Sequence, residues 1–196
     1  DKRARQLITG ATGNVNTMYR NATTEDIIRV IAHADTLSAR YTALYADHLR
    51  EKHGDNLREI LHDVWRLLRG LKYKPDDSHQ KIKSPAQLIA DGVGDCKSYS
   101  VFVASVLKNL GVHYVYRYAD YDRDNDVNHV YVIAKPTGRK PIIIDAVHTV
   151  FDDEAKGANY AFDLDVNTNT RNVAKMSGIG SGQGGGLVGV AIAGII

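Results

Sequence analysis

The first half of the chain is patterned for helices. Apolar and aromatic residues recur every three or four positions from Ile27 to about residue 50, and again from Leu57 to Leu71. This spacing puts them on one face of a helix. Thr23, followed by acidic residues, is a suitable N-cap. The pattern predicts one long helix over about 24–50 and a second that ends near Leu71.

Two further helices are expected before the pattern changes. Ser84-Pro85 is typical of a helix start, with serine as N-cap and proline in the first helical position. A third amphipathic stretch begins at Cys96 and ends before Gly111. Its core-facing stripe is Val103, Val106, Leu107 and Leu110. The only cysteine of the chain therefore opens a helix that is expected to be central and buried.

After Gly111 the period becomes that of strands. Residues 112–118, 129–134 and 141–146 are rich in Val, Ile and Tyr, and a turn centred on Thr137-Gly138 separates the last two. Helices followed by an antiparallel meander indicate an α+β fold.

The two ends differ from the middle. Residues 1–22 are polar and aperiodic, so we expect a flexible arm or a segment that orders on a partner. Residues 166–196 form a Gly-rich, apolar tail whose final apolar run is shorter than the roughly 18 residues that span a membrane. The tail is expected to pack on its own domain or a neighbouring subunit, or to act in assembly or membrane insertion. One domain should cover 23–165, with a helical lead-in over 23–72.

Composition excludes several classes of protein. The chain has a net charge of +2 and no block of five like charges, so nucleic-acid binding is not expected. A single cysteine cannot form an internal disulfide and favours a reducing compartment. No signal peptide is visible, and a chain that begins with Asp1 is expected to be trimmed.

The position of Cys96 points to nucleophilic chemistry. Unpaired N–H groups and the helix dipole favour the thiolate at a helix N-terminus. A thiol protease or acyl transferase also needs a base and a group that orients the base. Among the eight histidines, the predicted hairpin selects His129, since a turn at 137–138 sets it beside Asp145 on the next strand. We expect Nδ1–H of His129 to bond that carboxylate, and the helix to pack on the sheet face shared by His129, Tyr131 and Ile133.

These residues resemble the transglutaminase-like cysteine hydrolases, which have a papain-like core. The motifs are Gly94-Asp95-Cys96 opening a helix, Asn128–Val132 on a strand and Ile144-Asp145-Ala146 on the next, within a match over roughly 56–150. The resemblance implies that Cys96 is the nucleophile, His129 the general base and acid, and Asp145 the orienting carboxylate. It implies that the reaction needs no cofactor. It also implies an oxyanion site made by the Cys96 backbone N–H and an upstream side chain. Gln87 and Gln80 are the candidates for that side chain, and Trp65 is assigned to the core.

Other chemistry is weaker in this sequence. His113 and His148 are expected to be packing or surface residues. A metal site is not expected, because zinc-ligand spacings are missing. The acidic stretch from Asp120 to Asn128 lacks the glycine and glutamate of a calcium loop, so a solvated acidic turn beside the cleft is expected.

Two function classes follow. The first is a thiol-dependent hydrolase or acyl transferase that acts on an amide or isopeptide bond of a peptide or protein, for example a cell-wall peptide. The second is an assembly component of a phage virion or other complex, in which the catalytic-type domain is accessory or inactive. Residues 1–22 and 177–196 would then mediate contacts to other subunits or to a second copy. The expected location is cytoplasmic or virion-associated.

Overall fold

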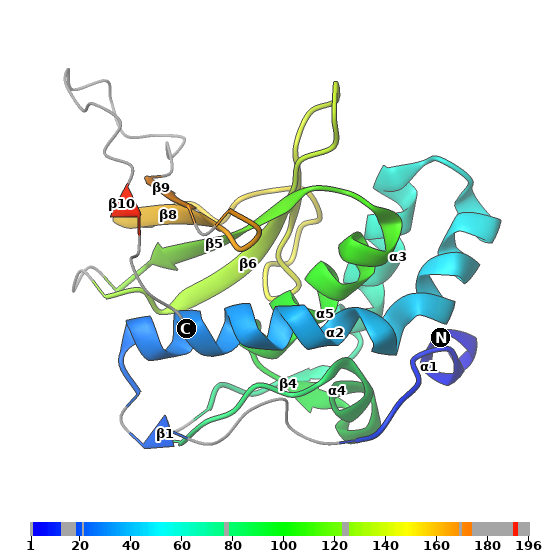
Figure 1. The fold of residues 1–196 in the computed structure, drawn as a ribbon, viewed down its shortest axis with the longest axis horizontal. Helices are drawn as coiled ribbons and strands as arrows, with labels where there is room; N and C mark the ends of the chain where they lie inside the picture. Colours follow the sequence, from blue (N-terminus) through cyan, green and yellow to red (C-terminus); the bar gives the residue numbers. More distant parts are fainter. Residues whose placement is uncertain are drawn as a thin grey trace.

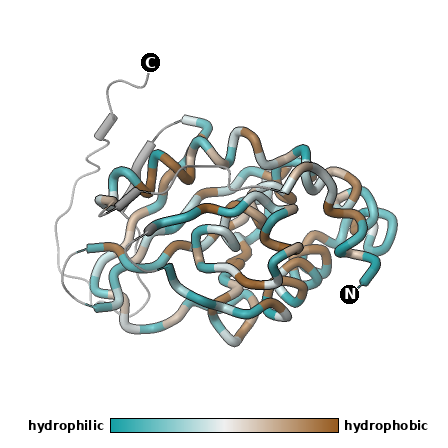
Figure 2. Tube along the Cα trace, turned by 90° about the horizontal axis from the view of Figure 1, so that it is seen from below, coloured by the Kyte–Doolittle hydropathy of each residue, from teal (hydrophilic) through white to brown (hydrophobic). Residues whose placement is uncertain are grey.

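The computed structural model describes residues 2–12, 19–20, 22–76, 79–122, 126–168, 170–173 and 190–191. These residues form an α+β fold, as predicted, in which helices lie against an antiparallel sheet (Figure 1). Along the coiled parts of the trace, hydrophobic residues are interspersed with hydrophilic ones (Figure 2). No helix in the described part of the chain has the length and apolar character needed to cross a membrane.

The predicted helices are present with the expected caps. The helices are α1 (Lys2–Gln6), α2 (Thr24–His53), α3 (Leu57–Arg69), α4 (Pro85–Asp91) and α5 (Cys96–Leu110). Thr23 and Asp26 form a reciprocal capping box at the start of α2. Ser84 accepts the backbone N–H of Gln87 at the start of α4, and Gly111 ends α5 with φ of 67°. Glycine suits that left-handed conformation because it has no Cβ.

The main sheet extends the predicted meander. The strands are β1 (Tyr19–Arg20), β2 (Lys72–Tyr73), β3 (His79–Gln80), β4 (Val93–Gly94), β5 (Tyr114–Asp120), β6 (His129–Ala134), β7 (Ile142–Ile144), β8 (Tyr160–Asp165), β9 (Thr170–Val173) and β10 (Val190–Ala191). The sheet order is β10-β9-β8-β5-β6-β7, and each neighbouring pair is antiparallel. Two small pairs, β1 with β3 and parallel β2 with β4, lie outside this sheet.

Helix α5 lies in the core between α2 and the sheet. It packs on the sheet face that carries Val130, Val132 and Ala134, and Ser100 in its second turn donates to the carbonyl of Val130 at 3.0 Å. Tyr131 and Ile133 belong to a separate cluster on the opposite face. The predicted packing face was therefore wrong. His129 nevertheless comes near α5, because it is the first residue of β6.

Part of the N-terminal segment, for which a flexible arm or a segment that orders on a partner was expected, packs on the domain. Ala4 and Ile8 are buried in the main core, and the backbone N–H of Thr9 donates to the carbonyl of Tyr41 at 3.0 Å. A five-residue helix is too short to show a periodic pattern, so tertiary contacts stabilise it. The predicted tail contacts of 177–196 lie outside the described residues, except for 190–191.

Candidate active site

Cys96 is the first residue of α5 and is buried. Asp95 caps the helix, because its Oδ1 accepts the backbone N–H of Ser98 at 3.0 Å. The thiol therefore lies where unpaired backbone donors and the helix dipole stabilise a negative charge.

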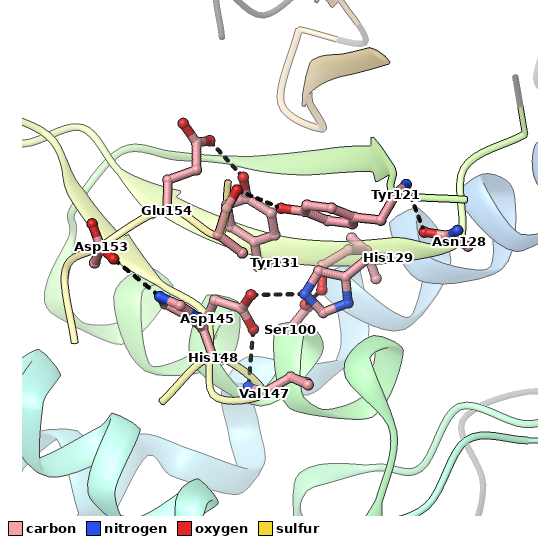
Figure 3. A network of polar contacts seen from close by, with 12 residues as sticks. Ser100, Tyr121, Asn128, His129, Tyr131, Asp145, Val147, His148, Asp153 and Glu154 are labelled. Atoms are coloured by element: carbon pink, nitrogen blue, oxygen red, sulfur yellow. Dashed lines mark hydrogen bonds and ion pairs between the residues drawn. The ribbon is translucent and has the colours of Figure 1, made fainter. Parts of the chain in front are cut away.

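His129 and Asp145 are joined across the hairpin. Nε2 of His129 lies 2.7 Å from Oδ2 of Asp145 (Figure 3). Strands β6 and β7 pair Val132 with Ile144, so Asp145 follows the paired part of β7 and lies diagonally from His129. The carboxylate is fixed further because its Oδ1 accepts the backbone N–H of Val147 at 2.9 Å. The predicted pair is present, but the ring uses Nε2 instead of Nδ1, which leaves Nδ1 for the thiol.

The environment keeps the imidazole of His129 charged. Burial lowers its pKa, but hydrogen bonds to Asp145 and Cys96 and the negative charges of both groups raise the pKa to about 10. Burial raises the pKa of Asp145, and the hydrogen bond and charge of His129 bring it below its usual value. An imidazolium between a carboxylate and a thiol is the electrostatic arrangement that favours a thiolate.

Cys96 and His129 line one small pocket of about 60 Å³. Its other lining residues come from the start of α2, from β3, from α5, from β5 and β6, and from the end of the loop between these two strands: Thr24, Ile27, Gln80, Lys97, Tyr118, Val127, Asn128 and Val130. The walls are mainly apolar. The pocket is therefore suited to an uncharged group of modest size next to the sulfur.

Two tyrosine rings pack against His129. The ring centroids of Tyr121 and Tyr131 lie 5.9 Å and 5.6 Å from that of the imidazole (Figure 3). The hydroxyl of Tyr131 donates to Glu154 at 2.6 Å, and Glu154 in turn pairs with Arg117 at 2.5 Å. These contacts fix the ring of Tyr131 beside the imidazole.

The two glutamine candidates for the oxyanion site lie in different places. Nε2 of Gln87 donates to Oδ1 of Asp91 within α4 at 2.5 Å, and Gln87 is not part of the pocket lining. Gln80 does line the pocket beside Cys96. The structure thus brings Gln80, and not Gln87, to the candidate nucleophile.

Among known proteins, the chain is similar only to solved structures. No family model and no curated protein matches the chain. Legionella pneumophila LapG superposes with a TM-score of 0.46 and 20% identity over 67% of this chain and 81% of that one. The EGTA-treated form of LapG gives 0.48 and 20% over 81% of this chain and 89% of that one. A candidate cysteine protease from Cytophaga hutchinsonii gives 0.39 and 18% over 64% and 43%. At this identity the likeness concerns the fold and carries no information about chemistry.

Sequence reasoning missed several neighbours of the site. Trp65, assigned to the core, is only partly buried and donates its indole N–H to the backbone carbonyl of Asp145 at 2.9 Å. Tyr73 at the end of β2 lies close enough to Cys96 that burial, and then the charge of Cys96, raise its pKa. Lys97 is a buried lysine that follows the cysteine directly. No local pattern marks Trp65 and Tyr73, because each reaches the site through a contact between distant segments, whereas Lys97 is next to the cysteine in the chain and no pattern marks its burial.

His113 and His148 lie away from the candidate active site. Nε2 of His113 lies 2.8 Å from Asp165, and Nε2 of His148 lies 3.1 Å from Asp153. Within the described residues, no three His, Cys, Asp or Glu side chains are grouped in a way that could hold a metal ion. The acidic stretch 120–128 includes residues 123–125, which lie outside the described residues.

Proposed function

We propose that this protein is a cysteine hydrolase with a transglutaminase-like, papain-like active site that cleaves an amide bond in a peptide or protein. Cys96 is the nucleophile, His129 the general base and acid, and Asp145 the carboxylate that orients the ring. One observation carries the proposal: the 2.7 Å bond between His129 and Asp145 holds an imidazole on the wall of the pocket that Cys96 also lines.

The reaction would proceed through an acyl-enzyme. In the resting ion pair the proton of the Cys96 thiol already lies on His129, and the thiolate sulfur attacks the amide carbon to form a C–S bond while the carbonyl electron pair moves onto the oxygen. When the C–N bond breaks, the imidazolium gives that proton to the leaving amine. A water molecule then attacks the thioester, His129 accepts one of its protons, and the acid is released as the thiolate re-forms. An amine in place of water would give transfer instead of hydrolysis.

Two donors are proposed for the oxyanion that forms during the attack. The backbone N–H of Cys96 is at the start of α5, where no carbonyl within the helix accepts it. Gln80 of β3 lines the same pocket, and its side-chain amide is the second proposed donor. Donors held in place before the reaction stabilise the developing charge without reorganisation.

The test is acylation of the protein by p-nitrophenyl acetate. We expect a burst of one p-nitrophenolate per chain, with the acetyl group on Cys96 in the mass spectrum, and no burst for Cys96→Ala. His148→Ala is a matched control for histidine loss, because His148 bonds an exposed Asp153 away from the pocket. Its burst should match that of the wild type. A folded wild-type protein that gives no burst would contradict the proposal.

A further inference from the structure

Lys97 is a charged side chain buried beside the candidate nucleophile. Its side chain is 8% exposed and lines the same pocket as Cys96 and Gln80. A buried ammonium group destabilises a protein unless carboxylates or other acceptors compensate for the lost hydration. Asp95 and Asp76 supply this compensation: Lys97 contacts Oδ2 of Asp95, and its Nζ lies 3.4 Å from Oδ2 of Asp76.

The contact with Asp95 orients the start of α5. Asp95 is only 3% exposed, and its two carboxylate oxygens have different partners. Oδ1 accepts the backbone N–H of Ser98 at 3.0 Å, and Oδ2 pairs with Lys97. The ammonium therefore fixes the rotation of the capping side chain, and the cap fixes the turn that carries the backbone N–H of Cys96.

The contact with Asp76 reaches the other proposed oxyanion donor. The carboxylate of Asp76 accepts the backbone N–H of Lys81 at 2.7 Å. Lys81 follows Gln80 directly, so a continuous set of contacts runs from α5 through Lys97 and Asp76 to the strand that presents Gln80. Both proposed donors are thereby tied to one ammonium group.

We propose that Lys97 is a positioning residue that holds the backbone N–H of Cys96 and the amide of Gln80 in the positions in which both can donate to the oxyanion. This inference rests on the proposed function and names a residue that the triad does not include. The ammonium stays charged at neutral pH. Burial lowers the pKa of Lys97, but the charges of Asp95, Cys96 and Asp76 raise it above its ordinary value.

Two reactions of Cys96 separate positioning from a simple charge effect. Acylation by p-nitrophenyl acetate passes through an oxyanion. Alkylation by iodoacetamide occurs at a tetrahedral carbon, forms no oxyanion and depends only on the thiolate. The ratio of the two rate constants therefore reports on the oxyanion site alone.

The experiment compares this ratio in the full chain and its variants. For Lys97→Met we expect the ratio to fall by about tenfold or more, since loss of one oxyanion donor costs about 100-fold or more. Lys97→Arg keeps the positive charge and should restore most of the ratio. Lys83→Met is the matched control, because Lys83 contacts Asp91 and the carbonyl of Val93 and not Asp95 or Asp76. It should leave the ratio unchanged.

A second variant covers the case in which Lys97→Met does not fold. Asp76→Asn leaves the buried pair of Lys97 with Asp95 intact and weakens only the connection to Gln80. It should lower the ratio, and it should have little further effect in a Gln80→Ala background. Equal losses of acylation and alkylation, or an unchanged ratio in a folded Lys97→Met or Asp76→Asn variant, would overturn the inference. A wild-type protein without acylation would overturn the proposed function itself.

Discussion

The indole N–H of Trp65 donates a hydrogen bond to the backbone carbonyl of Asp145, with 2.9 Å between the two heavy atoms. Trp65 lies in the middle of α3, and Asp145 is the first residue after β7. The ring of Trp65 also contacts Phe151 and stacks on His62. Helix α3 therefore fixes the backbone that carries the carboxylate bound to His129. A tryptophan outside the pocket thus contributes to the position of the carboxylate that binds the imidazole.

Replacing this indole should weaken the site without removing its packing. For Trp65→Phe we expect a loss of about 1 kcal/mol in the free energy of unfolding, as for one hydrogen bond, and slower acylation of Cys96. Urea denaturation and the p-nitrophenyl acetate burst measure the two effects. Phe151→Leu is the control, because it changes the same aromatic group and keeps the hydrogen bond. Equal effects of both variants on acylation would contradict the assigned role.

The charge of His129 should depend on both of its acidic neighbours. Asp145→Asn removes the negative charge that stabilises the imidazolium, so the pKa of His129 should fall from about 10 toward its ordinary value. Cys96→Ala should lower it as well, because the thiolate charge is lost. NMR titration of the imidazole protons measures both shifts. Asp153→Asn, at an exposed carboxylate paired with His148, should leave the titration of His129 unchanged.

The contact between His129 and Asp145 also makes the free energy of unfolding depend on pH. The pKa of His129 is raised in the folded protein relative to about 6.5 in the unfolded chain. A raised pKa contributes stability that is full below pH 6.5 and disappears as the pH rises through about 10. The difference in unfolding free energy between wild type and His129→Gln should therefore shrink between pH 6.5 and 10. A difference that stays constant over this window would show that the imidazolium pair is not present.

The sequence could predict the contact between His129 and Asp145 and the place of Cys96 at a helix start, because local rules position these residues. A cap and an apolar stripe put Cys96 at a helix start, and a tight turn at Thr137-Gly138 brings His129 and Asp145 together. The face of the sheet was mispredicted because alternation says which residues share a face and not which face a helix covers. By alternation His129 shares the face of Tyr131 and Ile133. Because His129 is the first residue of β6, its side chain can still contact α5 around the end of the strand.

The rest of the site depends on contacts between distant segments. Trp65 comes to the site through α3 and Gln80 through β3, and Lys97 contacts Asp76 across the loop that precedes α4. Gln80 was a candidate in the sequence, but a single sequence does not encode such long-range pairings locally. Strand β8 is a different case. Tyr160, Phe162 and Leu164 alternate with smaller or acidic residues, so a strand signal was present in the sequence and was overlooked.

The glycine before the candidate nucleophile should not accept a side chain. A Cβ on Gly94 would lie 2.3 Å from Cδ1 of Leu88 and 3.1 Å from Cε1 of Tyr99, both of which are buried. Gly94→Ala should destabilise the protein by about 1–3 kcal/mol and slow the reactions of Cys96, because β4 leads directly into α5. In the Leu88→Ala background the penalty should be smaller, since the new methyl group enters the space left by Leu88. Thermal unfolding of the four proteins measures this coupling, and additive effects would contradict the steric cause.

A buried carboxylate holds α2 to the core. Asp35 is 2% exposed, and it accepts the hydroxyls of Tyr114 at 2.6 Å and Tyr116 at 2.9 Å and pairs with Lys108 at 2.5 Å. Asp35→Ala would leave the two buried hydroxyls without their acceptor and would remove the ion pair of Lys108, which keeps only the backbone carbonyl of residue 35, so we expect a loss of about 3–5 kcal/mol in unfolding free energy. Asp47→Ala, on an exposed position of the same helix, should change it by less than about 0.5 kcal/mol. Urea denaturation of both variants measures the difference. If the two losses were equal, the network would contribute nothing specific, and apolar packing alone would hold α2 on α5.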